Sequence, residues 1–167
     1  MRVRLCFLLG CLWSTAVAAA PEVPVALGVD AGVISDVAPA RQAPSMAFHA
    51  GIGLPGGRFA LVARVDGWTL ADVGSVVANS ELTTSLSALA TGPIAHGFFW
   101  SASAGPSVTF LNRAGAPTES RPGLLVLPSV GLATRRRTLA IQVGAEALLN
   151  TGGLRLGATA GVVYTFF

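Results

Sequence analysis

The chain has few charged residues, only two cysteines and no long apolar run after its N-terminal segment. Of its 167 residues, 11% are charged and 52% are hydrophobic, whereas about a quarter of the residues in soluble domains are charged. Too few charges are therefore present to cover a water-facing surface. Beyond the N-terminal segment no stretch of about 18 apolar residues occurs, which argues against a transmembrane helix there. The two cysteines, Cys6 and Cys11, both lie close to the start.

The first nineteen residues are predicted to be a cleaved export signal. Arg2 and Arg4 precede a short apolar core, LCFLLGCLW, which is followed by the small residues STAVAAA. This is the order of a secretory signal peptide, with cleavage expected after Ala18 or Ala19. The mature chain, residues 20–167, is then a single domain without cysteine. It is exported to an oxidising compartment but cannot use disulfides there.

A lipoprotein signal is the alternative for this N-terminus. The letters LLGC resemble a lipoprotein processing site that ends at Cys11, where a lipid would be attached. The apolar core before that cysteine would be very short, so we favour cleavage by the ordinary signal peptidase.

Eight segments of the mature chain alternate large apolar residues with small or polar ones, which is the period-two pattern of β-strands. They span residues 25–34, 46–54, 58–67, 81–91, 97–110, 123–134, 138–149 and 154–167. The sixth segment is apolar on both faces and contains Pro128, so its register is the hardest to assign. Long connections alternate with short ones, the long ones being 35–45, 68–80 and 111–121. This pattern predicts an all-β, up-and-down meander of eight antiparallel strands with one loop-bearing rim.

Alternating strands of this kind fit two opposite β-barrels. A soluble exported barrel of the lipocalin kind packs its apolar face inside, whereas a transmembrane barrel turns that face to lipid. Glycines crowd the polar face of these strands, and on a water-facing strand they would weaken the sheet for no gain. Inside a narrow eight-stranded barrel they leave room for larger neighbours. Glycine placement therefore favours the transmembrane barrel.

The ionisable residues of the strands agree with this assignment. All lie in the same phase as the glycines, and none lies on the large apolar face, where a charge costs roughly 2–4 kcal/mol at mid-membrane. Carboxylates and guanidiniums can pair inside a closed lumen, so we predict an internal polar network. Its members are Asp30, His49, Arg64, Asp66, Glu81, Glu146 and Arg155. Because hydrocarbon demands that every backbone N–H and C=O be paired, the last strand must close the sheet against the first.

Aromatic residues cluster near the predicted strand ends. Those in the lipid-facing phase at the short-turn rim are Phe59, Phe98, Trp100, Tyr164 and Phe166, with Phe167 behind the last of them. Rings in such positions form the interfacial girdle of a membrane barrel. Phe48 and Phe110 are expected near the opposite rim.

A cysteine-free, exported chain of eight alternating strands that ends on aromatic residues resembles the small bacterial outer-membrane β-barrels of the OmpA-transmembrane-domain and OmpX type. The resemblance covers residues 20–167 and is one of architecture, without a specific motif. It implies location in the cell outer membrane, periplasmic termini, long external loops, and recognition of the closing strand by the barrel-assembly machinery. In that family the last residue and the one two before it are aromatic. Tyr164 and Phe166 have this spacing, and Phe167 follows, so either phenylalanine can be the recognised terminal aromatic.

No motif in the sequence carries catalytic or cofactor chemistry. His49 lies among small residues in the lumen phase and His96 lies in a short turn, and neither has a serine two residues away on the same face. No His or carboxylate spacing suggests a metal site, and the GIG motif lies in a strand without a following helix. No basic patch is interleaved with aromatic residues, so no nucleic acid partner is expected. We expect no cofactor.

These observations predict a non-enzymatic, monomeric outer-membrane barrel with a structural, envelope-integrity or surface-interaction role. An eight-stranded lumen filled by charged side chains leaves no large pore. The expected partners are outer-membrane lipid and the assembly machinery. The alternatives are a soluble, exported ligand-binding barrel and, third, a lipid-modifying barrel enzyme. The membrane assignment would be wrong if the apolar face, with Leu27, Phe48, Leu61 and Ile141, pointed toward the barrel axis.

Overall fold

The computed structural model describes residues 23–37, 41–55, 57–71, 78–113, 115–134 and 138–166, with the side chains of 41, 68–71 and 78–79 left out. The predicted export signal and Phe167 lie outside this description. No helix among the described residues is long and apolar enough to span a bilayer.

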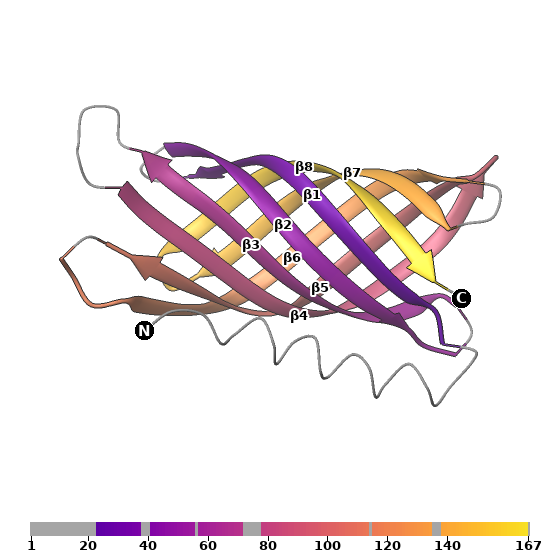
Figure 1. Cartoon of the computed structure of the whole chain (residues 1–167), viewed down its shortest axis with the longest axis horizontal. Coiled ribbons are helices and arrows are strands. Elements are labelled where there is room, and N and C mark those ends of the chain that lie inside the picture. Colours follow the sequence, from indigo (N-terminus) through magenta and orange to yellow (C-terminus); the bar gives the residue numbers. More distant parts are fainter. Residues whose placement is uncertain are drawn as a thin grey trace.

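Eight antiparallel strands form a closed barrel, in which each strand pairs with its neighbours along the chain and the last pairs with the first (Figure 1). They are β1 (Val25–Asp36), β2 (Arg41–Gly53), β3 (Phe59–Ala71), β4 (Ala78–Ala95), β5 (Phe98–Asn112), β6 (Glu119–Ala133), β7 (Leu139–Asn150) and β8 (Gly153–Phe166). The predicted eight-stranded meander and its closure are thus confirmed. Figure 1 shows the strands running obliquely to the long axis of the barrel.

The stagger of the strands follows from the register around the sheet. Starting at Val25, paired residues lead through Ile52, Leu61, Ala88, Ala104, Val126, Ala147 and Leu156 and return to β1 at Ser35. One circuit therefore climbs ten residues, from position 25 to position 35. A stagger of this size over eight strands tilts them by about 40° and leaves an interior just wide enough for side chains.

The strands are longer, and the connections at one rim shorter, than the sequence predicts. Long connections are expected at 35–45, 68–80 and 111–121, but the gaps between strands there are only 37–40, 72–77 and 113–118. Arg41 to Ser45 lack large apolar residues in the outward phase, yet they pair with β1 from Arg41↔Asp36 to Ser45↔Gly32. These residues form a strand because β1 lies beside them as a pairing partner, and not because their side chains alternate. The expectation of long loops is therefore wrong.

This extension of β2 also moves Phe48. It is expected near the loop-bearing rim, but it pairs with Val29 and Val65 in the middle of the sheet. The prediction of a rim position for Phe48 is wrong, because the strand begins five residues earlier than its alternation suggests.

Two prolines interrupt the hydrogen-bonded ladders without breaking the barrel. The β4–β5 pairing is interrupted at Pro106, between Ser85↔Ser107 and Ala88↔Ala104, and resumes in the same register. Pro128 causes the same gap between β6 and β7, because proline has no N–H to donate. Both prolines face outward and are exposed, while β5 and β6 remain paired with each other along their whole length.

Large apolar side chains cover the outside of the barrel. Phe48, Leu61 and Ile141 are 59, 49 and 59% exposed, and Leu27 in the same phase is partly exposed. The inward positions between them are mostly small, hydroxyl-bearing or charged, and many are buried. A soluble barrel needs the opposite arrangement, so the soluble ligand-binding alternative does not fit this structure.

Inward-facing glycines make room for particular large side chains on the neighbouring strand. Gly28 pairs with His49, and a Cβ atom added to it would lie 2.1 Å from Nε2 of that histidine. Gly131 pairs with Phe99, and a Cβ atom there would lie 2.4 Å from Cζ of the ring. Both distances are far below van der Waals contact, so alanine would displace the ring in either place. Gly28 and Gly131 thus act as matched partners of larger residues.

Candidate functional site: the polar interior

The seven ionisable residues singled out in the sequence all lie inside the barrel. Six of them are 1–7% exposed, namely Asp30, Arg64, Asp66, Glu81, Glu146 and Arg155. The side chain of His49 is 10% exposed. They do not form one network, but belong to two groups at different depths of the barrel.

The first group surrounds Arg64, and we call Asp30, His49, Arg64, Asp66, Gln142 and Glu146 the mid-barrel cluster. Nε of Arg64 donates to both carboxylate oxygens of Asp66 at 2.9 Å. Its Nη atoms reach Asp30 and, at 3.3 Å, Oε2 of Glu146. A guanidinium has five N–H donors in a plane and can serve several acceptors at once. One cation thus joins three carboxylates that come from β1, β3 and β7.

His49 belongs to this cluster through its approach to Asp30. Its Nδ1 is 3.2 Å from Oδ2 of Asp30, but the geometry is not that of a hydrogen bond, and its Nε2 faces Gly28. No hydroxyl group in the described part of the chain hydrogen-bonds to His49. In the described part of the chain, this histidine and aspartate thus meet without a hydroxyl nucleophile hydrogen-bonded to the ring.

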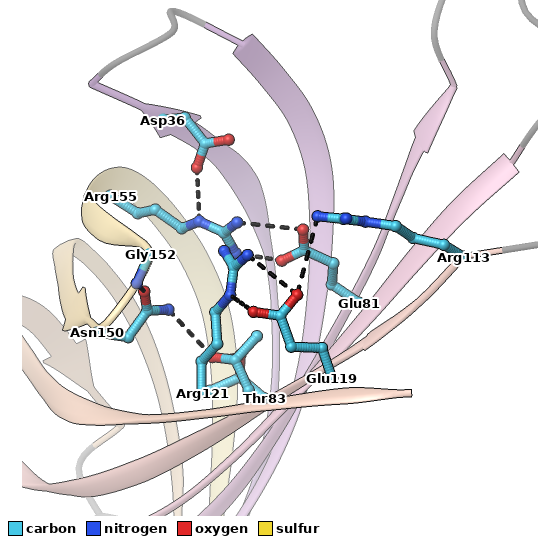
Figure 2. A network of polar contacts seen from close by, with 10 residues as sticks. Asp36, Glu81, Thr83, Arg113, Glu119, Arg121, Asn150, Gly152 and Arg155 are labelled. Carbon is cyan, nitrogen blue, oxygen red and sulfur yellow. Dashed lines mark hydrogen bonds and ion pairs between the residues drawn. The ribbon is translucent and has the colours of Figure 1, made fainter. Parts of the chain in front are cut away.

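The second group, the rim cluster, contains Asp36, Glu81, Arg113, Glu119, Arg121 and Arg155 (Figure 2). Arg155 approaches Asp36 with Nε at 2.5 Å and donates from both Nη atoms to Glu81. Figure 2 shows its guanidinium lying between these two acids. Since Asp36, Glu81 and Arg155 come from β1, β4 and β8, this contact ties together strands that are distant in sequence.

The outermost part of the rim cluster is open to solvent. Nε of Arg121 donates to Glu119 at 2.8 Å, and Arg113 lies 4.0 Å from the same carboxylate. The side chains of Glu119 and Arg113 are 49 and 52% exposed, so these pairs stabilise little. The rim cluster contains three arginines and three acids and is balanced. The mid-barrel cluster sets three carboxylates against one guanidinium.

An apolar layer separates the two clusters. Its members are Ile34, Ala43, Leu125 and Leu148, which are 0–5% exposed and pack together. On β1, Ile34 lies between Asp30 and Asp36, and on β7, Leu148 lies between Glu146 and Asn150. The polar atoms of the interior are therefore not continuous from one rim to the other along these strands.

Hydroxyl side chains line the inner wall of β4, β5 and β6. The hydroxyls of Thr83 and Thr109 lie 2.9 Å apart, and those of Ser101 and Ser129 lie 2.5 Å apart. In contrast, Ser85, Ser87 and Ser107 are 9, 3 and 5% exposed and have no hydrogen-bond partner in the described part of the chain. The interior thus has a charged side and a hydroxyl side.

Five aromatic side chains project outward near the rim where β1 begins and β8 ends. Phe59, Phe98, Trp100, Tyr164 and Phe166 are 43–59% exposed. Phe59 and Phe98 begin their strands and Phe166 ends β8, so they share one level. Tyr164 and Phe166 contact each other edge to face, with ring centroids 4.7 Å apart.

Sequence reasoning missed several partners of the predicted ionisable residues. Asp36, Glu119 and Arg121 were assigned to connections, although each keeps the inward parity of its strand, as Asp36 does with Asp30. Gln142 has the same strand parity as Glu146 and donates to Oδ1 of Asp30 at 3.3 Å. In the described residues no group of three or more His, Cys, Asp or Glu side chains is arranged to hold a metal ion.

Comparison with known proteins gives matches in structure only. No protein-family model and no curated protein sequence matches this chain. Neisserial surface protein A matches with a TM-score of 0.68 at 15% identity, over 86% of this chain and 97% of that one. The N-terminal β-barrel domain of OprF from Pseudomonas aeruginosa matches with a TM-score of 0.62 at 14% identity, over 84% and 97%. Ail, the attachment invasion locus protein of Yersinia pestis, gives 0.62 at 9% identity, over 86% and 97%.

These matches agree with the closed eight-stranded topology. At sequence identities this low, the matches are evidence for the fold alone. The architecture that the sequence resembled is nevertheless the one found: the chain has the fold of the small eight-stranded outer-membrane β-barrels.

Proposed function

We propose that the protein is an integral outer-membrane barrel without enzymatic activity, which contributes to the integrity of the envelope. The observation that carries this proposal is the combination of an apolar exterior with an interior occupied by buried, ion-paired side chains. Such an exterior is stable in contact with lipid. Because side chains fill the interior, we assign the barrel a structural role in the membrane and not a transport role.

The membrane location is supported by the outer surface and the rims. Exposed large apolar side chains occur on every strand, and the aromatic residues Phe59, Phe98, Trp100, Tyr164 and Phe166 suit a headgroup-level girdle. Strands of 12–18 residues are long enough to cross, since about 9–11 tilted residues span the hydrocarbon core.

A packed lumen without a large pore is supported by the side chains that fill it. Arg64 reaches from β3 to carboxylates on β1 and β7. Leu125 and Leu148, in the apolar layer, are only 1 and 0% exposed. Phe99 fills space beside Gly131 near the opposite rim. Solutes of porin size would have to displace buried ion pairs, which is costly.

A structural role is favoured over a large surface-binding role by the short gaps between strands. At the rim where β1 ends and β8 begins, these are residues 37–40, 72–77, 113–118 and the turn after Asn150. Connections this short offer little surface for a binding head. A lipid-modifying activity is disfavoured because His49 faces the interior, away from the lipid surface.

Fractionation and conductance test the location and the packed lumen. The full-length protein should be recovered with outer membranes and should change its gel mobility on heating, as folded barrels do. In planar bilayers it should give no stepwise conductance of porin size. Recovery in the soluble periplasm would contradict the location, and porin-like steps would contradict the packed lumen.

A deletion strain tests the role. Loss of the protein should raise sensitivity to detergents and release periplasmic enzymes, and the wild-type chain should reverse both effects. As a matched control, the exposed-rim variant Arg113→Leu should complement as well as wild type, since it leaves the barrel intact. Normal detergent resistance in the deletion strain, together with loss of adhesion to a surface, would favour the surface-interaction role instead.

Recognition by the assembly machinery is proposed for the closing strand. Replacing both Tyr164 and Phe166 by alanine should lower the amount of folded barrel in the outer membrane. Phe59→Ala, a girdle residue on another strand with similar exposure, is the control. Equal folded levels for the two variants would argue that the closing aromatics act only as girdle residues.

A further inference from the structure

We propose that the interior binds one hydrated monovalent cation, such as Na⁺ or K⁺, between Glu146 on β7 and the unpartnered serines of β4 and β5. Two independent features of the mid-barrel cluster and its surroundings point to this site. The first is a shortage of positive charge, and the second is a set of buried hydroxyls without partners.

The shortage of positive charge concerns Asp30, Asp66 and Glu146. All three carboxylates contact Arg64, and His49 lies 3.2 Å from Asp30, so even with a protonated histidine two positive charges face three negative ones. The remaining cations of the interior, Arg155 among them, belong to the rim cluster beyond the apolar layer, where three acids already oppose three arginines. Uncompensated charge is expensive in a buried site, so further positive charge is required near Arg64.

The buried hydroxyls are those of Ser85, Ser87 and Ser107. Each is at least nine-tenths buried, points inward and lacks a hydrogen-bond partner in the described part of the chain. Buried polar groups are nearly always paired with protein or with ordered water. A proton on one carboxylate would reduce the charge but leave these hydroxyls unpaired. Water alone would pair them but leave the charge. A hydrated cation meets both needs as one ligand, whereas the alternative needs a proton on a carboxylate and a separate water.

The two features meet at Arg64. Its Cα is the cross-strand partner of Ser85, and Ser85 is in turn the partner of Ser107. The guanidinium of the same Arg64 extends to Oε2 of Glu146 on β7. Ser85 and Glu146 are therefore separated by at most the length of one arginine side chain plus the spacing between two neighbouring strands.

Only one carboxylate oxygen in the cluster has no hydrogen-bond donor or cation of its own among the described residues. Both oxygens of Asp66 accept from Arg64, and those of Asp30 accept from Gln142 and Arg64. Oε1 of Glu146 makes no hydrogen bond or ion pair within the described residues. A divalent ion prefers several carboxylates, which this site does not provide. One carboxylate oxygen, neutral hydroxyls and water suit a monovalent ion.

Thermal unfolding in defined salts tests the proposal. The purified full-length barrel in detergent is heated in choline chloride, and NaCl or KCl replaces it at constant ionic strength. We expect Tm to rise and saturate, by roughly 5–10 °C once the cation is a hundredfold above its dissociation constant. Glu146→Gln, and separately the pair Ser85→Ala and Ser107→Ala, should abolish the rise. Glu119→Gln, at the exposed rim, should retain it.

A direct measurement keeps the proposal testable if a variant fails to fold. Crystals of the wild-type barrel soaked in thallium or rubidium salts should show an anomalous peak between Glu146 and the hydroxyls of Ser85, Ser87 and Ser107. Each of three results would overturn the proposal: no such peak, a Tm that is the same in choline, sodium and potassium, or an unchanged cation effect in Glu146→Gln. A Tm that responds to pH but to no cation would show that protons balance the cluster instead.

Discussion

Replacing Arg64 by leucine tests whether the buried ion pairs hold the barrel together. Arg64 is 6% exposed and contacts Asp30, Asp66 and Glu146, which are themselves 1, 2 and 5% exposed. In the variant these three carboxylates remain buried and face one another without their shared cation. Removing one partner of a buried pair costs about 3–5 kcal/mol. Leucine fills part of the space, so we expect a loss near the lower end, about 3 kcal/mol.

A loss of this size is measurable, because proteins of this length are stable by only about 5–15 kcal/mol. The free energy of unfolding is measured by denaturant titration of the purified barrel in lipid vesicles, with Trp fluorescence and gel mobility as independent signals. Arg113→Leu is the matched control. Arg113 is 52% exposed and lies 4.0 Å from Glu119, so its removal should cost at most about 1 kcal/mol.

A second variant separates charge from packing. Adding Asp66→Asn to Arg64→Leu removes one of the stranded charges and keeps the shape of the side chain, so part of the lost stability should return. If Arg64→Leu is as silent as Arg113→Leu, the cluster does not contribute through buried charge. The idea that paired charges stabilise this interior would then be refuted.

Three further substitutions probe other parts of the barrel. Arg155→Leu should cost about 3 kcal/mol by the same titration, since it strands the buried carboxylate of Glu81; a loss below about 1 kcal/mol would count against this. Phe48→Arg, in the middle of the lipid-facing surface, should cost about 2–4 kcal/mol in bilayers, whereas Phe59→Arg at the rim should cost about 0–1 kcal/mol. Both phenylalanines are 59% exposed, so equal losses would argue against a bilayer there. Gly28→Ala should destabilise by about 1–3 kcal/mol through overpacking, and adding His49→Ala should restore stability; simple additivity in this double-mutant cycle would contradict the direct contact.

The strand number, order and facing of this protein follow from the sequence because they depend on local alternation. Val25 to Val33 and Met46 to Leu54 already show which side is large and which is small. Together with the low charge, this is enough to predict that Phe48 and Leu61 face outward. Closure follows from the need to pair every backbone group in hydrocarbon.

The strand ends and the contacts of the interior depend on partners that are distant in the sequence. Arg41 to Ser45 show no alternation and become a strand only because β1 lies opposite them. Glu146 and Arg64 are both predicted to face inward, but the contact between Nη2 of Arg64 and Oε2 of Glu146, at 3.3 Å, depends on the closure and stagger of the whole barrel. Alternation predicts which residues face inward and does not predict which of them meet.

The pairing of Gly28 with His49 and of Gly131 with Phe99 has a consequence for how this chain can change over evolutionary time. In each pair the small member is tolerated only beside its large neighbour, and the large member only beside its small one. A change at one position opens a void or creates a clash that a change at the other repairs. Homologous barrels should therefore show covariation between positions 28 and 49, and between 131 and 99, even where neither position is invariant.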